Sequence, residues 1–232
     1  MSKNINHLGI IMDGNRRWAR SKGFSTLKGH RKGYDKVKEI GELCLKKGIK
    51  ILTVYAFSTE NWHRSKKEVR YLMKLLKNAM INEIEYFKKQ NIRVRIIGRI
   101  SDLSLDMQKS IKKMEQATKN GKKGFLNIAI SYGGRTEIVN AIKKIIKEKI
   151  PLDKITEEIV NNKLYTAGLP DPDLIVRTSG EQRLSGFLLW QSSYSELYFP
   201  DVYWPDFSED DLDKALNWFK NRKRRFGGDT NK

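Results

Sequence analysis

Short apolar runs that alternate with amphipathic helical patterns constrain the fold of this chain more than any other feature of its sequence. Four runs are typical of buried strands: residues 7–13, 49–58, 92–98 and 124–131. Helices are predicted from the apolar periodicity at residues 32–48, 66–90, 104–119, 135–148 and 208–222. Ser104 and Ser208 are predicted to cap the helices that follow them. This order of elements builds a mostly parallel sheet that helices cover on both faces.

Nothing in the sequence divides the chain into separate domains. It contains no low-complexity tract, no internal repeat and no long linker rich in Pro, Gly or Ser. Its 232 residues are enough for one good-sized hydrophobic core. We therefore predict a single α/β domain over residues 1–232.

Polar segments follow three of the predicted strands at the point where each strand ends. Asp13, Ser58 and Ser131 occupy these ends. Ligands of parallel sheets gather at the carboxyl ends of the strands. We expect the three ends to converge on one site.

The first strand end resembles a site for magnesium and phosphate. Asp13-Gly14-Asn15 alone is also typical of a simple turn, but residues 13–31 hold six Arg and Lys residues and one acid. Arg16 and Arg17 supply forked donors suited to phosphate oxygens. A lone carboxylate among such cations is suited to Mg²⁺, which takes one or two carboxylates, waters and substrate phosphates. The nucleotide-binding patterns GxxxxGK[ST] and GxGxxG after a strand are absent from the sequence.

The second strand end carries side chains suited to catalysis and binding. Glu60 and Asn61 could accept hydrogen bonds or relay a proton, and Arg64 could bind phosphate. Trp62 offers a broad apolar face. The alternative is that Trp62 and Phe57 belong to the hydrophobic core.

A third group of functional side chains lies in the last quarter of the chain. Arg177, Arg183 and Ser185 form a candidate anion-binding set around a Ser-Gly turn. Glu181 and Glu196 are candidate metal ligands or ion-pair partners. Dense aromatic residues in the same region favour a subunit interface over the core; they are Phe187, Trp190, Tyr194, Tyr198, Phe199, Tyr203 and Trp204.

Charge and cysteine content limit the partners and the compartment. The net charge of +19 suggests polyanionic partners: nucleic acid, an anionic membrane surface or phosphorylated small molecules. Cys44 is the only cysteine and is expected to be a packing residue, so a cytoplasmic location is the default. Apolar runs are far shorter than the roughly 20 residues of a membrane span. The first ten residues do not resemble a secretory signal.

The ordered motifs of the chain resemble those of the cis-prenyltransferases, whose best-known members are the bacterial undecaprenyl diphosphate synthases. The resemblance covers about residues 7–228 and rests on HLGIIMDGNRRWAR, GHRKG, YAFSTENWHR, VRIIGR, LNIAISYGGR, DPDLIVRTSGEQRLSGFLLWQSSYSELYF and WPDF…RRFGG. It implies a Mg²⁺-dependent enzyme that elongates an allylic diphosphate, usually farnesyl diphosphate, with isopentenyl diphosphate units. The product would be a long-chain cis-polyprenyl diphosphate such as undecaprenyl diphosphate, the precursor of a lipid carrier for cell-wall or glycan synthesis.

The resemblance also implies a homodimer and an apolar tunnel for the growing chain. The tunnel is expected between the sheet and the helices at 32–48 and 66–90. The C-terminal RRFGG segment would complete the site across the dimer interface. Contact with the membrane, where it occurs, would be peripheral and through the product.

Residue roles follow from the resemblance, position by position. Asp13 would guide Mg²⁺ and the allylic diphosphate, Asn61 would accept a proton, and Glu196 would be associated with the metal. The allylic substrate would be bound or lined by Gly14, Asn15, Arg16, Arg17, Trp18, His30, Ser58, Thr59, Glu60, Trp62 and Arg64. Isopentenyl diphosphate would be bound by Arg177, Arg183, Leu184 and Ser185.

Several positions depart from the family pattern. Arg16 stands where many bacterial members have glycine and archaeal or eukaryotic members often have arginine. Thr26 replaces an arginine that binds diphosphate, and we expect Lys28 or Arg31 to compensate. Gln182 stands where many bacterial members have a metal-associated histidine.

Two departures bear on the tunnel and the turn beside it. Ile130 replaces a small residue and is expected to narrow the tunnel and shorten the product, although the small Ala56 leaves its own part open. Ser65 replaces a proline.

Two other functions are compatible with parts of the sequence. An inactive partner subunit would lack Asp13, Asn61 or the Arg177 and Arg183 pair, and all are present. A nucleic-acid-binding protein would expose stacking aromatics on a basic face, whereas these aromatics lie inside apolar runs. We therefore expect no nucleic-acid partner.

Overall fold

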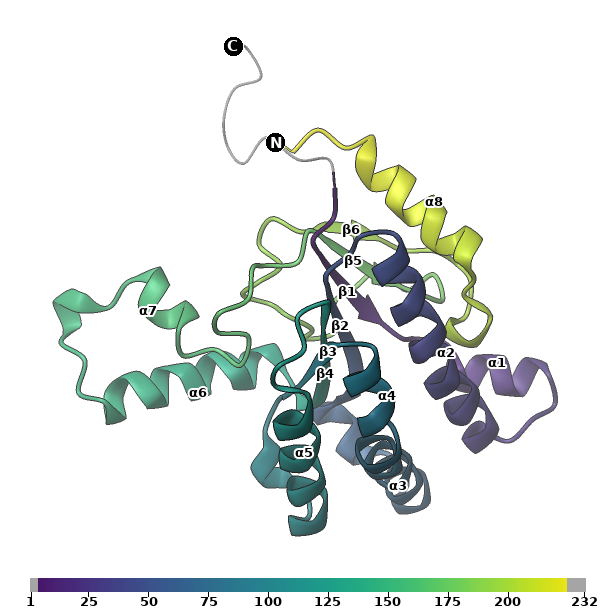
Figure 1. Ribbon diagram of the computed structural model, residues 1–232, viewed down its shortest axis with the longest axis horizontal. Coiled ribbons are helices and arrows are strands. Elements are labelled where there is room, and N and C mark those ends of the chain that lie inside the picture. The colour runs from purple at the N-terminus through teal and green to yellow at the C-terminus, as the bar shows by residue number, and fades with distance from the viewer. Residues whose placement is uncertain (1–3, 225–232) are drawn as a thin grey trace.

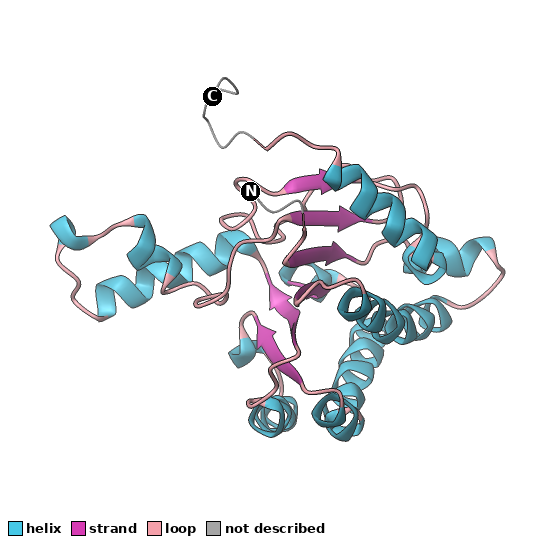
Figure 2. Cartoon of the chain, turned by 45° about the horizontal axis from the view of Figure 1, so that its top comes forward, coloured by secondary structure: helices cyan, strands magenta, loops and turns pink. Residues whose placement is uncertain are grey.

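A six-stranded sheet in the order β3-β4-β2-β1-β5-β6 forms the centre of the molecule, and every neighbouring pair of strands is parallel. The computed structural model describes residues 4–224 (Figure 1). The strands are β1 (His7–Ile11), β2 (Ile51–Ser58), β3 (Ile92–Ile97), β4 (Gly124–Tyr132), β5 (Leu174–Arg177) and β6 (Glu196–Tyr198). Figure 2 shows them side by side. The prediction of an α/β fold with helices around a parallel sheet is confirmed.

The helices are α1 (Asn15–Ser21), α2 (Thr26–Lys46), α3 (Lys66–Asn82), α4 (Ile84–Lys89), α5 (Leu105–Thr118), α6 (Gly134–Lys147), α7 (Glu157–Asn161) and α8 (Glu209–Lys220). Helices α2, α3, α4 and α5 lie close to the sheet, whereas α6 and α7 extend away from it (Figure 1). No helix in the described part of the chain is long and apolar enough to span a bilayer.

Side-chain caps fix where several helices begin. Ser104 Oγ accepts a hydrogen bond from Met107 N at 3.3 Å, and Ser208 forms a capping box with Asp211. Both predicted caps are confirmed. Ser65 caps α3 in the same way, since its Oγ accepts from Glu68 N.

The structure differs from the predicted elements in several places. The helix expected at 66–90 is two helices, because Glu83 ends α3 and begins α4. Helix α2 begins at Thr26 rather than 32. The short strands β5 and β6 and the helix α1 were not assigned from the sequence.

The main hydrophobic core lies between the sheet and the surrounding helices and includes Phe57, Ile130 and Trp204, all at most 1% exposed. A smaller core on the other face includes Phe187. Phe187 and Trp204 are therefore core residues and do not form the surface of a subunit interface. Cys44 is buried, as its predicted packing role requires.

Candidate active site

A polar cavity of about 900 Å³ opens where β1, β2, β4 and β5 end. Its lining contains six arginines: Arg16, Arg17, Arg20, Arg64, Arg135 and Arg177. The only acidic side chains among the described residues of this lining are Asp13 and Glu60. The cavity is therefore strongly electropositive and is suited to an anionic ligand.

Asp13 is held at the centre of this charge by donors on both of its oxygens. Its Oδ2 accepts a hydrogen bond from Arg177 Nη2 at 2.8 Å, and its Oδ1 accepts one from Gly14 N at 2.7 Å. Arg17 Nη2 lies 3.5 Å from Oδ1. Burial alone would raise the pKa of Asp13, but the hydrogen bond and charge of Arg177, with Gly14 and Arg17, hold it below its ordinary value. The carboxylate is therefore ionised at neutral pH.

Only glycine fits at position 14, because the backbone there has a positive φ and leaves no room for a Cβ. Its φ is +102°, in the region that residues with a Cβ rarely adopt. A Cβ there would lie 2.7 Å from Tyr203 Cδ1. The close contact with Tyr203 places the backbone after Asp13 directly against the segment before α8.

Arg177 is the most buried cation of the cavity, at 5% exposure. Besides Asp13 it donates from Nη1 to Ser185 Oγ at 2.7 Å and to the Arg183 carbonyl oxygen at 2.5 Å. Its Nε is buried without a hydrogen-bond partner among the described residues. The Ser185 turn is thus tied to the end of β5 and to Asp13 through one guanidinium group.

A network of ion pairs around Glu181 joins the segment of Arg17 to the segment of Arg183. Glu181 Oε1 lies 2.9 Å from Arg17 Nη1, and Oε2 lies 2.5 Å from Arg183 Nη1. Arg17 Nη2 also donates to Ser179 Oγ at 2.5 Å. The hydrogen bond and charge of Arg183, followed by Arg17, lower the pKa of Glu181. Arg183 itself is exposed and does not line the polar cavity, and it would have to leave Glu181 to reach an anion there.

The end of β2 continues into a short 3-10 helix, Thr59–His63, which supplies three lining residues. Ser58, Thr59, Glu60 and Asn61 all line the polar cavity. Asn61 Oδ1 accepts from Ser58 N at 3.2 Å, so its carboxamide is oriented by the turn that carries it.

Two predicted residues of this region do not line the polar cavity. Trp62 donates from Nε1 to Ser131 Oγ at 3.0 Å and packs edge-on against Phe57. Ser131 in turn donates to Asp102. The β4 end does converge on the site as predicted, but through Gly133, Gly134, Arg135 and Thr136, which line the polar cavity, whereas Ser131 itself does not.

Glu68 is a site residue that sequence reasoning missed. Its Oε1 lies 2.9 Å from His30 Nε2 and 3.1 Å from Arg64 Nη1, and it is 8% exposed. Burial lowers the pKa of His30, although Glu68 opposes this; the pKa of Glu68 is itself lowered against burial by His30 and Arg64. Glu68 lies in the first turn of α3 and Arg64 precedes that helix, so no helical spacing in the sequence pointed to this contact.

Several predicted binding residues lie elsewhere. Trp18 is buried and donates to Asp206 at 2.7 Å, and Leu184 packs on the smaller core. Glu196 begins β6 in register with Leu174 and pairs with Arg222 Nε at 3.1 Å. It therefore lies at the amino end of the sheet within one chain, whereas Asp13 follows the carboxyl end.

The predicted replacements for the missing arginine at position 26 also lie outside the polar cavity. Lys28 Nζ lies 3.3 Å from the centre of the Phe24 ring, and Arg31 pairs with Asp35 at 3.2 Å. Neither lines the polar cavity, whereas Arg20 does. Arg20, not Lys28 or Arg31, is the further cation available to a ligand there.

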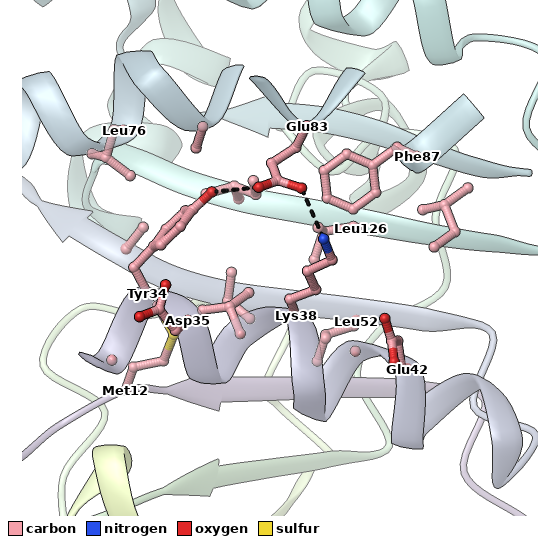
Figure 3. Close-up of a pocket in the computed structure, with 18 of the residues that line it drawn as sticks. Met12, Tyr34, Asp35, Lys38, Glu42, Leu52, Leu76, Glu83, Phe87 and Leu126 are labelled. Atoms are coloured by element: carbon pink, nitrogen blue, oxygen red, sulfur yellow. Dashed lines mark hydrogen bonds and ion pairs between the residues drawn. The ribbon is translucent and has the colours of Figure 1, made fainter. Parts of the chain in front are cut away.

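An apolar cavity of about 330 Å³ lies between the sheet and helices α2, α3 and α4 (Figure 3). Five residues line both cavities and mark the neck between them: Met12, Asn15, His30, Ala56 and Leu72. Asn15 Oδ1 is buried at this neck without a hydrogen-bond partner among the described residues. Ile130 is fully buried and is not among the residues that line either cavity, so the structure gives no support to the expectation that it narrows this space.

Whether a metal ion fits the site depends on the side chains that could coordinate it. The described residues contain no group of three or more His, Cys, Asp or Glu side chains arranged to hold a metal. Asp13, next to donors for phosphate oxygens, fits a Mg²⁺ ion that takes its remaining ligands from water and a diphosphate. The adjoining cavities fit an amphiphile with an anionic head and a hydrocarbon tail.

Comparisons with known proteins agree with this geometry. A sequence profile described as "Putative undecaprenyl diphosphate synthase" matches residues 11–227. A Picrophilus torridus protein named tritrans,polycis-undecaprenyl-diphosphate synthase (geranylgeranyl-diphosphate specific) is 51% identical over 227 residues, covering 95% of this chain and 89% of that protein. An isoprenyl transferase of Fusobacterium nucleatum is 49% identical over 229 residues, covering 98% of each. The crystal structure of lavandulyl diphosphate synthase from Lavandula x intermedia with dimethylallyl diphosphate has a TM-score of 0.93 at 36% identity, covering 97% of this chain and 99% of that chain.

Proposed function

Because this chain belongs to the undecaprenyl diphosphate synthase family, whose members are prenyltransferases, we propose that it elongates an allylic diphosphate with isopentenyl diphosphate into a long-chain cis-polyprenyl diphosphate. The observation that carries the proposal is the neck between the two cavities. An arginine-rich space on one side of Asn15 and Ala56 adjoins an apolar space on the other, and both spaces are lined by these residues. A prenyl diphosphate has the same division into an anionic head and an apolar tail.

The head of the allylic substrate would be bound by the Asp13 segment. Arg16, Arg17 and Arg64 offer donors to diphosphate oxygens, and His30 lies beside them. The reaction breaks the bond between the allylic carbon and the diphosphate, so negative charge develops on the leaving group. Guanidinium groups already in place there stabilise that charge in the transition state.

Isopentenyl diphosphate would be bound by the Arg177 segment. Arg177 and Ser185 line the same cavity as Asp13, and Arg183 is exposed at its margin. The unpartnered Nε of Arg177 is a donor available to a ligand. The Asp13–Arg177 pair would then hold the two diphosphate sites at a fixed separation.

Proton removal completes each condensation. The new carbon–carbon bond leaves a cation on the isopentenyl unit, and loss of a proton from it forms the new double bond. Asn61 matches the residue that the family resemblance assigns as proton acceptor, and its hydrogen bond to Ser58 N supports a fixed orientation. Glu60, whose pKa is lowered despite burial, lies next to it as an ionised carboxylate.

Mg²⁺ is part of the proposal. Asp13 would hold it, and when bound it would supply positive charge to the departing diphosphate. Glu196 could join this site only from a second chain, since within one chain it lies at the other end of the sheet.

The hydrocarbon tail would occupy the apolar cavity between the sheet and helices α2 and α3. Burial stabilises a chain by roughly 0.8 kcal/mol for each CH₂ group removed from water. Each added five-carbon unit therefore favours continued binding, and product release is expected to be slow. A detergent or a bilayer should accelerate release, which would make contact with a membrane peripheral.

Farnesyl diphosphate is the proposed starter. One relative is named for geranylgeranyl diphosphate and another only as an isoprenyl transferase, at nearly equal identity. Both starters therefore belong in the first assay.

A cytoplasmic homodimer is the proposed state of the protein. Helix α6 exposes an apolar stripe at Val139, Ile142 and Ile146, which are 49%, 48% and 70% exposed. These positions share one face of the helix. A second copy of the chain would remove this stripe from water.

A single assay tests the reaction. The protein is incubated with farnesyl or geranylgeranyl diphosphate, labelled isopentenyl diphosphate and Mg²⁺, and the dephosphorylated lipids are sized by chromatography. We expect a ladder of products that grow by five-carbon units and require Mg²⁺. The absence of labelled lipid with either starter, from folded protein, contradicts the proposal.

A further inference from the structure

One side of the apolar cavity is closed by polar and charged side chains. Tyr34 and Lys38 on α2 and Glu83 at the α3–α4 junction line the cavity, and we call these three residues the clasp. Tyr34 donates to Glu83 Oε1 at 3.1 Å, and Lys38 Nζ lies 3.2 Å from Glu83 Oε2. Figure 3 shows both α2 side chains pointing toward Glu83 across the space between the helices.

Neighbouring contacts reinforce the clasp. Lys38 Nζ lies 3.7 Å from the centre of the Tyr86 ring, and the Tyr86 hydroxyl donates to Glu42. Burial and the charge of Glu83 raise the pKa of Tyr34, so its hydroxyl stays a donor throughout the neutral range. The Glu83 side chain is 23% exposed, which places the clasp between the cavity and solvent.

The clasp lies at a joint in the helical wall. Glu83 is the residue at which α3 ends and α4 begins. The bonds of its carboxylate therefore connect α2 directly to the junction between α3 and α4. In the described residues, hydrogen bonds join α2 to α3 and α4 at two places. One is the pair of His30 and Glu68 at the neck, and the other is the clasp with its Glu42–Tyr86 neighbour.

The opposite wall of the cavity is the sheet, where β2 and β4 are paired along their length. Its strands cannot separate without loss of backbone hydrogen bonds, so the width of the cavity depends on the position of the helices. A hydrocarbon chain cannot replace the partners of Glu83 and Lys38, and separating these charges to admit it is unfavourable. The clasp therefore resists widening of the cavity.

We infer that the clasp limits the length of the polyprenyl product by fixing the separation of α2 from the α3–α4 junction. The inference rests on the proposed function, because it assigns the growing chain to this cavity. Once the chain fills the space between the neck and the clasp, a further unit must push the helices apart against the bonds to Glu83. Elongation slows at that length.

Glu83→Ala removes the shared acceptor of the clasp and leaves the cavity otherwise lined as before. Glu85→Ala is the matched control, since Glu85 is two residues away, is 81% exposed and pairs only with Lys88 on its own helix. The products of both variants and of the wild type are sized after equal conversion of labelled isopentenyl diphosphate. We expect Glu83→Ala to shift the main product longer by at least one five-carbon unit and Glu85→Ala to leave it unchanged.

A second variant, Tyr34→Phe with Lys38→Met, removes both donors and keeps Glu83. It decides the question if Glu83→Ala does not fold, and the same lengthening is expected from it. Products of wild-type length, or shorter ones, from a folded clasp variant would overturn the inference alone. A wild type that adds no isopentenyl units overturns the proposed function and the inference together.

Discussion

The carboxylate of Asp13 lies between guanidinium groups that come from opposite ends of the chain. Arg17 is four residues away, whereas Arg177 is separated from it by 164 residues. Arg177 is buried, and the ion pair with Asp13 offsets the cost of burying its charge, because an unpaired buried cation is unfavourable. Asp13 therefore contributes to the electrostatics of the site and also connects two segments that lie far apart in the sequence.

Asp13→Asn keeps the shape of the side chain and removes its charge. We expect the initial rate of isopentenyl incorporation to fall by about 100-fold or more, since the substitution removes an electrostatic contact at the reacting centre. Asp210→Asn, at an exposed position in the first turn of α8, is the control and should keep the wild-type rate. An Asp13→Asn enzyme as fast as the wild type contradicts the assigned role.

The lowered pKa of Asp13 predicts a pH dependence of stability. Because the folded pKa lies below the unfolded value of about 3.9, the ion pair stabilises the fold fully above that pH. The stabilisation is lost as the pH falls through the lower, folded pKa. The side chain is 30% exposed, so a contribution of about 1 kcal/mol or less is expected. In urea unfolding, the difference between wild type and Asp13→Asn should be constant near neutral pH and begin to shrink below about pH 4; a difference that grows as the pH is lowered contradicts it.

Helix α2 connects the two cavities and is fitted against α1 by a glycine. A Cβ at Gly33 would lie 2.1 Å from Asn15 Oδ1 and 3.0 Å from Trp204 Cδ1. Trp204 Nε1 also donates to the Gly33 carbonyl oxygen at 2.8 Å. The close approach at Gly33 therefore sets the position of Asn15 at the neck.

Gly33→Ala should displace α1 and reduce the free energy of unfolding by about 1–3 kcal/mol, the usual cost of overpacking. Gly41→Ala, two turns further along the same helix, is the matched control. Its added Cβ would meet only Leu52 Cδ2 at 3.9 Å, so the higher helix propensity of alanine should stabilise the protein by up to about 1 kcal/mol. Urea unfolding of both variants measures the contrast, and equal values for the two would refute the packing argument.

The elements that could be predicted from the sequence are those with a strong local pattern. The four long strands and the amphipathic helices carry enough apolar residues for periodicity to identify them. Strands β5 and β6 are only four and three residues long, too short for a period to show. The break at Glu83 has no Gly or Pro to mark it, so the apolar period continues through it.

The residues of the candidate site also fall into those that could be predicted from the sequence and those that could not. Asp13, Ser58 and Arg177 could be found because they end strands or follow the family motifs, and all line one cavity. Glu68 could not be assigned, because its contact with His30 depends on how α2 and α3 pack. Lys28 was misjudged for the same reason, since position 30 of α2 faces the site and position 28 faces solvent.

At the scale of the whole molecule, α6 and α7 extend from the body of the domain (Figure 2). The apolar stripe of α6 has no cover within the described chain. Its extension away from the sheet leaves room for a second subunit along the helix.

Ile142→Asp should convert the proposed homodimer into a monomer, because it places a charge in the centre of the stripe. Ile81→Asp on α3 is the control, since Ile81 is 47% exposed against 48% for Ile142. Light scattering after size-exclusion chromatography gives the mass of each. A wild-type mass of one chain contradicts the homodimer, and a dimeric Ile142→Asp protein contradicts the role of α6.

The pairing of β1 between β2 and β5 has a consequence for biosynthesis. A ribosome that has completed Asp13 must add 164 residues before Arg177 exists, which takes roughly 10–30 s at the usual speed of translation. By residue 132 the nascent chain contains β1 to β4, but until β5 is made the flank of β1 that receives it has unpaired backbone groups. This flank is where a chaperone would protect the growing polypeptide, and where aggregation would begin without one.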